Sequence, residues 1–222
     1  GYYGAKLARG GAEVHFLLHS DYEYVLNNGL QVNSCDGSFY IDRPNVYRRT
    51  EDMPQCDVVI VALKTTNNHL LTSLLPPLLK PDTMVLLIQN GIGVEASVEM
   101  MFPDIRLAAG LAFICSAKTE PGVVNHQCYG NINIGNYSCR DAARYAAMLD
   151  DMRKAGIGVA DVEYRQARWK KAVWNMPFNG MTVALDTQTD RLLSNPATSR
   201  LIREQMMEVI GAANALGVEG LD

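Results

Sequence analysis

Two short apolar runs constrain the fold of this chain more than any other feature of its 222 residues. The first run is Val58 to Leu63, directly after Asp57, and the second is Met84 to Ile88. Continuous apolar runs of this length, rich in Val, Ile and Leu, are typical of strands that are buried on both faces of a parallel sheet. The segment between them, residues 66–79, predicts a helix that stops at Lys80-Pro81. Strand and helix therefore alternate here, as they do in α/β proteins.

The same alternation continues on both sides of these runs. The sequence predicts helices over residues 1–9, 93–101 and 141–155, a hairpin over 30–41 that turns at Asp36-Gly37, and strands over 13–18, 105–114, 122–127, 130–134 and 158–162. This order predicts an α/β fold with a Rossmann-type doubly wound sheet.

The pattern changes near residue 162. From Arg165 onward only helical periodicity is present, and Asn195-Pro196 is a typical helix cap and first helical position. We therefore expect two domains, residues 1–162 and an all-helical part over 163–222. About 60 residues of helix bury little surface alone. We expect either truncation, with further helices beyond Asp222, or a partner chain in a homodimer through the helical domain.

Composition argues against several classes of protein. The formal charge of −4 and the absence of a long Lys/Arg run argue against nucleic acid as a partner. The longest apolar run is far shorter than the roughly 18 residues of a membrane span, and no signal peptide is visible. Five cysteines are scattered without a C-x-x-C pair, which predicts neither a metal site nor a disulfide framework and suits reduced thiols in the cytoplasm.

A polar stripe runs along the predicted helix after residue 165. Lys171, Asn175 and Asn179 are spaced at i, i+4 and i+8, so they share one face, and Trp169 and Trp174 flank them. One interpretation is a wall that faces a polar ligand. The other is a solvated lysine with two asparagines near a helix end, and spacing alone leaves both open. Pro177 lies between the two asparagines and removes one helix hydrogen bond, so a kink there would displace Asn179.

Two N-terminal loops carry candidate cofactor contacts. The small residues that begin at Gly1 predict the tail of a dinucleotide fingerprint or a helix packed closely on a sheet; the G-x-G-x-x-G glycines and the first strand are expected before Gly1. His19 and Ser20 follow the strand whose end selects the cofactor. Neither side chain repels a 2′-phosphate, which favours NADP, whereas nearby Asp21 weighs against it. A simple turn with Ser20 or Asp21 as an N-cap is the alternative.

Two further loops follow the buried strands. Lys64 comes after the first, and Asn90-Gly91-Ile92-Gly93 comes after the second, so both lie at the sheet edge where open α/β folds bind ligands. A solvated lysine and an ordinary turn are the alternatives.

Taken together, these segments resemble the ketopantoate reductase family, over essentially the whole chain. The resemblance rests on five motifs, which are Gly4-Ala5-Lys6-Leu7-Ala8 with Gly11-Ala12-Glu13-Val14, Val61-Ala62-Leu63-Lys64, Ile88-Gln89-Asn90-Gly91-Ile92-Gly93, Gly130-Asn131-Ile132-Asn133-Ile134-Gly135, and Lys171-x-x-x-Asn175-x-x-x-Asn179.

The resemblance implies an NADPH-dependent reductase of a 2-oxo acid, most specifically 2-dehydropantoate, in pantothenate biosynthesis. It implies Lys171 as the general acid, with Asn175 and Asn179 as substrate contacts. It implies that Asn90 contacts the cofactor near its nicotinamide half and that Lys64 lines the cleft. Together with the candidates from the loops, the predicted cofactor residues are Gly1, His19, Ser20, Lys64, Asn90 and Gly91, and no metal is expected. The 1–162 domain would then bind the dinucleotide, and the 163–222 domain would bind substrate and dimerise.

Two alternatives remain from the sequence. A β-hydroxyacid dehydrogenase acting on a 3-hydroxy acid also uses a Lys with an Asn four residues later, although the Gln89-Asn90-Gly91 loop favours the reductase. A non-catalytic dinucleotide-binding protein would keep the fold without needing the Lys-Asn stripe.

Overall fold

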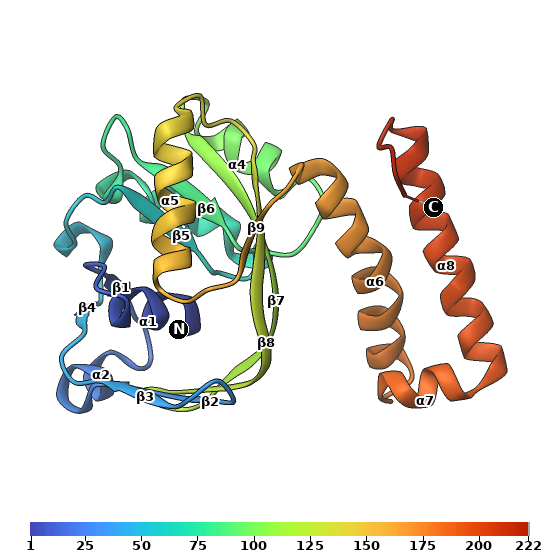
Figure 1. Ribbon diagram of the computed structural model, residues 1–222, viewed down its shortest axis with the longest axis horizontal. Helices are drawn as coiled ribbons and strands as arrows, with labels where there is room; N and C mark the ends of the chain where they lie inside the picture. The colour runs from blue at the N-terminus through green and yellow to red at the C-terminus, as the bar shows by residue number, and fades with distance from the viewer. Residues whose placement is uncertain (222) are drawn as a thin grey trace. The chain divides into compact units, whose positions relative to one another are not determined.

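A computed structural model describes residues 1–221 of the chain, which form two units. The first unit comprises residues 1–89 and 94–162, and the second comprises residues 90–93 and the described residues from 163 onward. In Figure 1 the first unit holds the strands and the second holds the long helices α6 and α8.

The first unit is a mixed α/β unit. Its strands are β1 (His15–Leu17), β2 (Leu30–Ser34), β3 (Phe39–Ile41), β4 (Asn45–Tyr47), β5 (Val58–Val61), β6 (Met84–Leu87), β7 (Arg106–Glu120), β8 (Val123–Asn136) and β9 (Val159–Asp161). Its α-helices are α1 (Tyr2–Arg9), α2 (Tyr22–Asn28), α3 (Leu71–Leu74), α4 (Val94–Met101) and α5 (Ala142–Lys154), and its 3₁₀ turns are η1 (Thr50–Asp52), η2 (Thr65–Leu70) and η3 (Pro76–Leu78).

Seven strands form the main sheet, in the order β3-β2-β8-β7-β6-β5 with β9 paired to β8. Neighbours β5, β6 and β7 are parallel, whereas β7 and β8 form a long antiparallel hairpin. Strand β1 pairs in parallel with β4 in a separate two-stranded sheet. The predicted α/β fold is thus confirmed.

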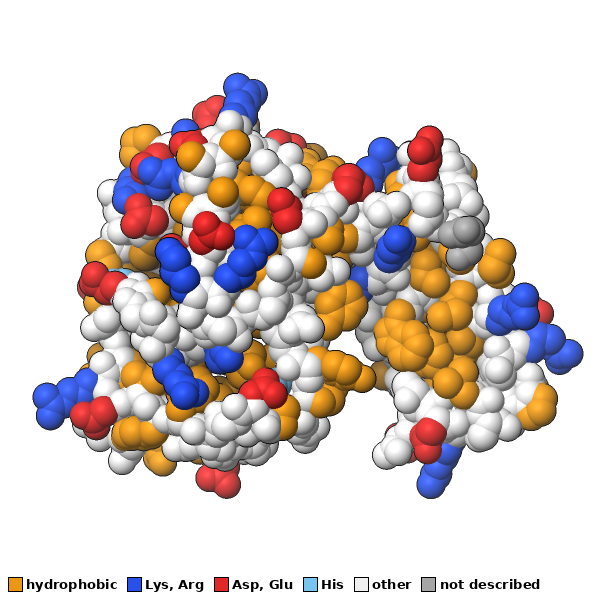
Figure 2. Space-filling view, viewed as in Figure 1, with side chains coloured by type: hydrophobic (Ala, Val, Ile, Leu, Met, Phe, Trp, Pro, Cys, Tyr) orange, Lys and Arg blue, Asp and Glu red, His pale blue; other side chains and the backbone are white. Residues whose placement is uncertain are grey.

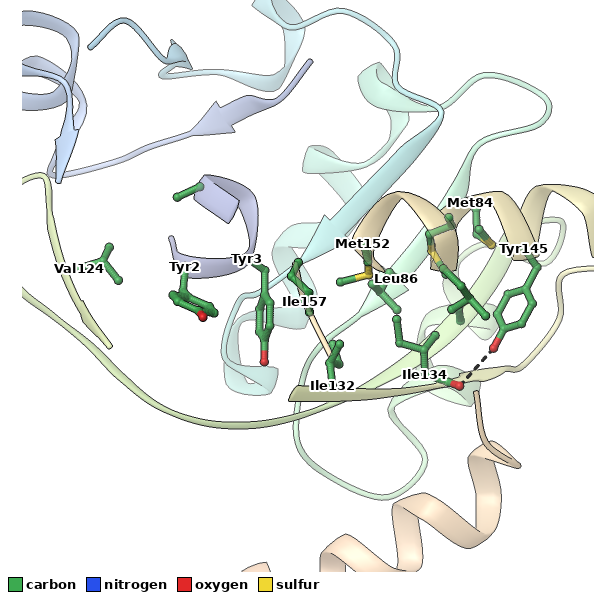
Figure 3. Packing of buried hydrophobic residues seen from close by; sticks show 14 of the residues in the cluster. Tyr2, Tyr3, Met84, Leu86, Val124, Ile132, Ile134, Tyr145, Met152 and Ile157 are labelled. Atoms are coloured by element: carbon green, nitrogen blue, oxygen red, sulfur yellow. Dashed lines mark hydrogen bonds between the residues drawn. The ribbon is translucent and has the colours of Figure 1, made fainter. Parts of the chain in front are cut away.

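Strand β6 explains why two cores form. Met84 and Leu86 contribute to one hydrophobic cluster, and Val85 and Leu87 contribute to the other, because successive side chains of a strand point to opposite faces. Helices α1 and α5 cover the first cluster, and α3 and α4 contribute to the second. Figure 3 shows the first cluster, where the Tyr145 hydroxyl of α5 donates a hydrogen bond to the Ile134 carbonyl of β8, at 3.2 Å.

Three segments differ from the sequence predictions. Residues 66–79 are not one helix, because Thr and Asn side chains compete for backbone hydrogen bonds at the start and Pro76-Pro77 lacks N–H donors near the end. Strand β4 was not predicted. The short strands expected at 122–127 and 130–134 are one strand, β8, in which Tyr129 and Gly130 adopt positive φ and the pairing shifts register.

The second unit is helical, as predicted. It contains α6 (Tyr164–Ala184), α7 (Thr189–Ser194) and α8 (Pro196–Ala215). Trp169 of α6 packs with Ala213 of α8 in one cluster, and Phe178 packs with Ile202 in another. The Asn195 side chain accepts a hydrogen bond from the Ala197 N–H, so the predicted cap is present. Among the described helices, none combines the length and apolarity that crossing a membrane requires.

Candidate functional site

Helix α6 presents four polar side chains along one face. The Glu163 carboxylate caps the helix by accepting hydrogen bonds from the N–H groups of Arg165 and Gln166, at 2.9 and 2.6 Å. With 3.6 residues per turn, this helix places four side chains of the second unit in line, and these are Arg168, Lys171, Asn175 and Asn179.

These four side chains line a pocket of about 220 Å³. Asn90, Gly91 and Ile92 of the same unit line it too, and Ala172 and Met176 complete the lining. The volume lies below the ~300 Å³ of the smallest drug-sized ligand pockets, so it suits a small polar molecule.

Lys171 is half-buried in this pocket, and its environment makes it a better proton donor. Burial, followed by the positive charge of nearby Arg168, lowers the pKa of Lys171 to about 8. Both causes disfavour the charged form of the amine. A lysine with this pKa remains largely protonated at neutral pH and releases its proton more readily than an ordinary lysine, as a general acid needs.

Arg168 is the site residue that the sequence analysis missed. Its guanidinium group is buried, with the residue only 4% exposed, and it lines the pocket three residues before Lys171. A signal was available, because positions i and i+3 share a helix face. Guanidinium forks match carboxylates in geometry and charge, so Arg168 equips the pocket for an acidic ligand.

Pro177 does not end the helix. Helix α6 runs through it to Ala184, and Asn179 still lines the same pocket as Lys171 and Asn175. Lys170, the neighbour of Lys171, is exposed and lies outside this lining.

The loop after β6 has a conformation that requires glycine. Gly91 and Gly93 have φ angles of 124° and 76°, in the region that side-chain-bearing residues rarely adopt. Buried Gln89 fixes the start of this loop, because its amide nitrogen donates to the Leu63 carbonyl and to Asn68 Oδ1, both at 2.7 Å. The loops after β5 and β6 are therefore joined to each other.

Two of the predicted cofactor residues, Lys64 and Gly1, belong to the first unit. Lys64 is exposed and immediately precedes η2, where its carbonyl accepts a hydrogen bond from the Asn67 N–H, at 2.8 Å. Gly1 precedes α1, and its carbonyl accepts from the Ala5 N–H, at 3.0 Å. A Cβ at Gly1 would lie 2.9 Å from Val124 Cγ2, so the residue is also closely packed.

His19 and Ser20 are exposed beyond the end of β1, and a lysine that the sequence analysis missed reaches Ser20. Lys118 of β7 donates to Ser20 Oγ at 3.3 Å and to Asp21 Oδ1 at 2.8 Å. Although burial acts in the opposite direction, hydrogen bonds from Lys118 and Ser20 lower the pKa of the Asp21 carboxyl. The acidic residue that weighed against NADP is thus paired with a cation. No local pattern could have found Lys118, which lies 97 residues from Asp21.

Family models and relatives identify what this chain is similar to. A model described as ketopantoate reductase PanE/ApbA matches residues 1–138, and its C-terminal counterpart matches residues 163–222. A 2-dehydropantoate 2-reductase from Nostoc sp. is 44% identical over 98% of this chain and 70% of its own length.

Solved structures of proteins with the same name are similar to this chain as well. The 2-dehydropantoate 2-reductase of Geobacter metallireducens shares 38% identity with a TM-score of 0.94, covering all of this chain and 74% of its own. The enzyme of the same name from Methylococcus capsulatus shares 33% identity with a TM-score of 0.85, covering 97% of this chain and 70% of its own.

Proposed function

This chain belongs to the ketopantoate reductase family, and from that premise we propose that it reduces 2-dehydropantoate to pantoate with NADPH. The observation that carries the proposal is the half-buried Lys171, with its lowered pKa, in a small pocket lined by Arg168 and two asparagines. The β-hydroxyacid dehydrogenase alternative is not favoured, because these similar proteins are named 2-dehydropantoate 2-reductases.

Each polar residue of the pocket has its own role in the proposed reaction. When bound, NADPH supplies the hydride that attacks the 2-oxo carbon of the substrate. Lys171 then stabilises the negative charge that develops on the carbonyl oxygen and donates its ammonium proton to that oxygen. Arg168 binds the substrate carboxylate, and the side-chain amides of Asn175 and Asn179 hold the carbonyl or hydroxyl oxygen in position.

The first unit offers groups that fit an NADP 2′-phosphate. Ser20 Oγ accepts a hydrogen bond from Lys118, and His19 is exposed beside them, so a phosphate at this place would meet a hydroxyl and a cation. We infer that Asn90 and Gly91 contact the nicotinamide half, with Gly1 and Lys64 as further cofactor contacts. In this scheme residues 1–162 bind the dinucleotide, and residues 163–222 bind substrate.

The proposed activity implies a pathway, a compartment and an assembly for this protein. We infer from the family that the protein serves pantothenate biosynthesis. We infer that it does so in the cytoplasm, because its free thiols suit a reducing compartment. We also infer a homodimer through the helical unit. The support is the apolar surface that Figure 2 shows on that unit. Several large apolar side chains of the unit are exposed, among them Trp174, Leu201 and Met207.

A turnover assay tests the proposed function. We expect NADPH oxidation, followed by its absorbance, when 2-dehydropantoate is added, and no cofactor reduction when a 3-hydroxy acid is added with NADP. Turnover of the 3-hydroxy acid, without turnover of 2-dehydropantoate, would establish a β-hydroxyacid dehydrogenase instead. Cofactor binding without turnover of either acid would indicate a non-catalytic dinucleotide-binding protein.

A further inference from the structure

A second cluster of reactive side chains lies where β2 ends beside β8. Ser34 and His126 are opposite each other in the parallel pairing of these strands, and the Cys35 N–H donates to the His126 carbonyl at 3.1 Å. The sheet therefore brings Cys35 and Asp36, in the turn between β2 and β3, next to a histidine about 90 residues away in sequence. None of these residues lines the Lys171 pocket.

The His126 ring is held in one orientation. It is 3% exposed, its centroid lies 4.2 Å from that of the Tyr2 ring, and a Cβ at Gly130 would lie only 3.2 Å from its Nε2. Nε2 lies 3.1 Å from the Tyr129 carbonyl oxygen. Because a carbonyl oxygen only accepts hydrogen bonds, Nε2 carries the ring proton and Nδ1 keeps its lone pair.

Tyr129, whose carbonyl contacts the His126 ring, has a strained backbone conformation. Tyr129 has a φ of 66°, which is uncommon for a residue other than glycine, and it lies where the β7–β8 pairing shifts register. Such local strain persists only when surrounding contacts enforce it, and it is frequent at functional sites. Here the strained residue supplies the carbonyl that fixes the histidine tautomer.

Nδ1 lies close to two side chains of the turn after β2. Nδ1 lies 3.8 Å from Cys35 Sγ and 4.0 Å from Asp36 Oδ2, and the three ligand atoms lie within 4.8 Å of one another. In a tetrahedral zinc site with ordinary bond lengths, neighbouring ligand atoms are about 3.4 to 3.6 Å apart. Small rotations of the exposed Cys35 and Asp36 side chains would close the difference.

We propose that Cys35, Asp36 and His126 bind one Zn²⁺ ion, with water as the fourth ligand. Thiolate, imidazole and carboxylate are the three ligand types that zinc takes in proteins, and the thiol proton leaves to solvent when sulfur binds. A histidine ligand that donates its other N–H to a backbone carbonyl is the usual outer arrangement of such sites. The ion would join the β2–β3 turn to β8.

The Ser34 side chain contacts the same ring nitrogen that would bind the metal. Its hydroxyl lies 2.8 Å from Nδ1 and, by the tautomer argument, donates to the lone pair that the metal would use. The Asp36 N–H in turn donates to Ser34 Oγ, at 3.1 Å. Ser34 therefore competes with the ion for Nδ1, and its removal should leave zinc binding unchanged or stronger.

Metal titrations of the intact protein test the proposal. With Co²⁺ as the probe, we expect a near-ultraviolet thiolate-to-cobalt band with one equivalent bound, and calorimetry should give the same stoichiometry for Zn²⁺. Cys35→Ser should abolish the band, and both Cys35→Ser and Asp36→Asn should weaken Zn²⁺ binding by about 10-fold or more. Both changes are on exposed side chains, so folding should be retained.

Two variants serve as matched controls. Cys56→Ser removes a thiol outside the cluster and should preserve the band, and Ser34→Ala should bind Zn²⁺ at least as tightly as the unmodified protein. The absence of a cobalt band in the unmodified protein would overturn the proposal. So would a Cys35→Ser variant that binds Zn²⁺ normally, or a Cys56→Ser variant that loses binding to the same extent.

Discussion

At the scale of single residues, the adjacent lysines of α6 differ in burial and therefore in expected role. Lys171 lies half-buried in the pocket, whereas Lys170 is exposed and points about 100° away around the helix. We expect Lys171→Ala to lower kcat by about 10²-fold or more, because the lost proton donor acts in the transition state. NADPH affinity, measured by calorimetry, should change little.

Lys170→Ala is the control for that experiment and should retain near-normal kcat. If it is the more damaging change, the assigned helix register is wrong. Asn175→Ala should raise KM for the 2-oxo acid as well as slow turnover, because a substrate-holding amide acts in both the ground and the transition state.

The lowered pKa of Lys171 also predicts how activity depends on pH. The proton donor must be protonated, so kcat/KM should fall as pH rises through about 8. Because the charge of Arg168 helps to lower this pKa, Arg168→Met should move the falling limb of the profile to higher pH while KM rises. If the falling limb of the profile stays at the same pH in a folded Arg168→Met variant, a group other than Lys171 causes it.

Cofactor preference also depends on single residues. We expect NADPH to bind more tightly than NADH, and Lys118→Ala to weaken NADPH binding by about 10-fold, or about 1.4 kcal/mol, with little effect on NADH. The variant would both lose a cation and leave the Asp21 charge without its Lys118 partner. Titration calorimetry measures each affinity, and Lys154→Ala, on the surface of α5, is the control. Equal affinity for both cofactors in the unmodified protein would contradict the NADP assignment.

At the scale of elements, we expect cofactor binding to depend on the backbone conformation of the loop after β6. Gly91→Val should weaken cofactor binding, because a β-branched residue is strained at a φ of 124° and its side chain would block close approach of the ligand. Gly37→Val is matched to it, since Gly37 also has positive φ, at 108°, but lies in the β2–β3 turn with open space around it. Equal cofactor affinity in the two folded variants would mean that the loop is an ordinary turn.

Elements also differ in how well local sequence specified them. Strand β6 and the helices α5 and α6 follow from periodicity, because each buries apolar side chains. Strand β5 was predicted as well, but three of its four residues are only partly buried, because it is the last strand in the order of the main sheet. Residues 65–78 did not follow the pattern, since a helix-like spacing of leucines was interrupted by prolines. Local hydrogen-bonding capacity decided the outcome there, and spacing did not.

At the scale of the whole molecule, we expect the protein to form a homodimer. We expect sedimentation to give a particle of twice the 24.5 kDa of one chain, because the helical unit exposes apolar side chains that a partner would cover. Met207→Lys on α8 should shift the equilibrium toward the monomer. Met100→Lys, at an even more exposed position on α4, should not. A monomeric unmodified protein would contradict the homodimer.

The sequence by itself determined the alternation of strands and helices and the line of Lys171, Asn175 and Asn179 on one helix face. Both are local consequences of periodicity, which any strand or helix must obey. Only the tertiary structure decided which distant groups meet: Lys118 with Ser20, Gln89 with Asn68, and His126 with Cys35. These contacts depend on strand order and pairing register, which burial of the whole sheet sets and no short segment encodes.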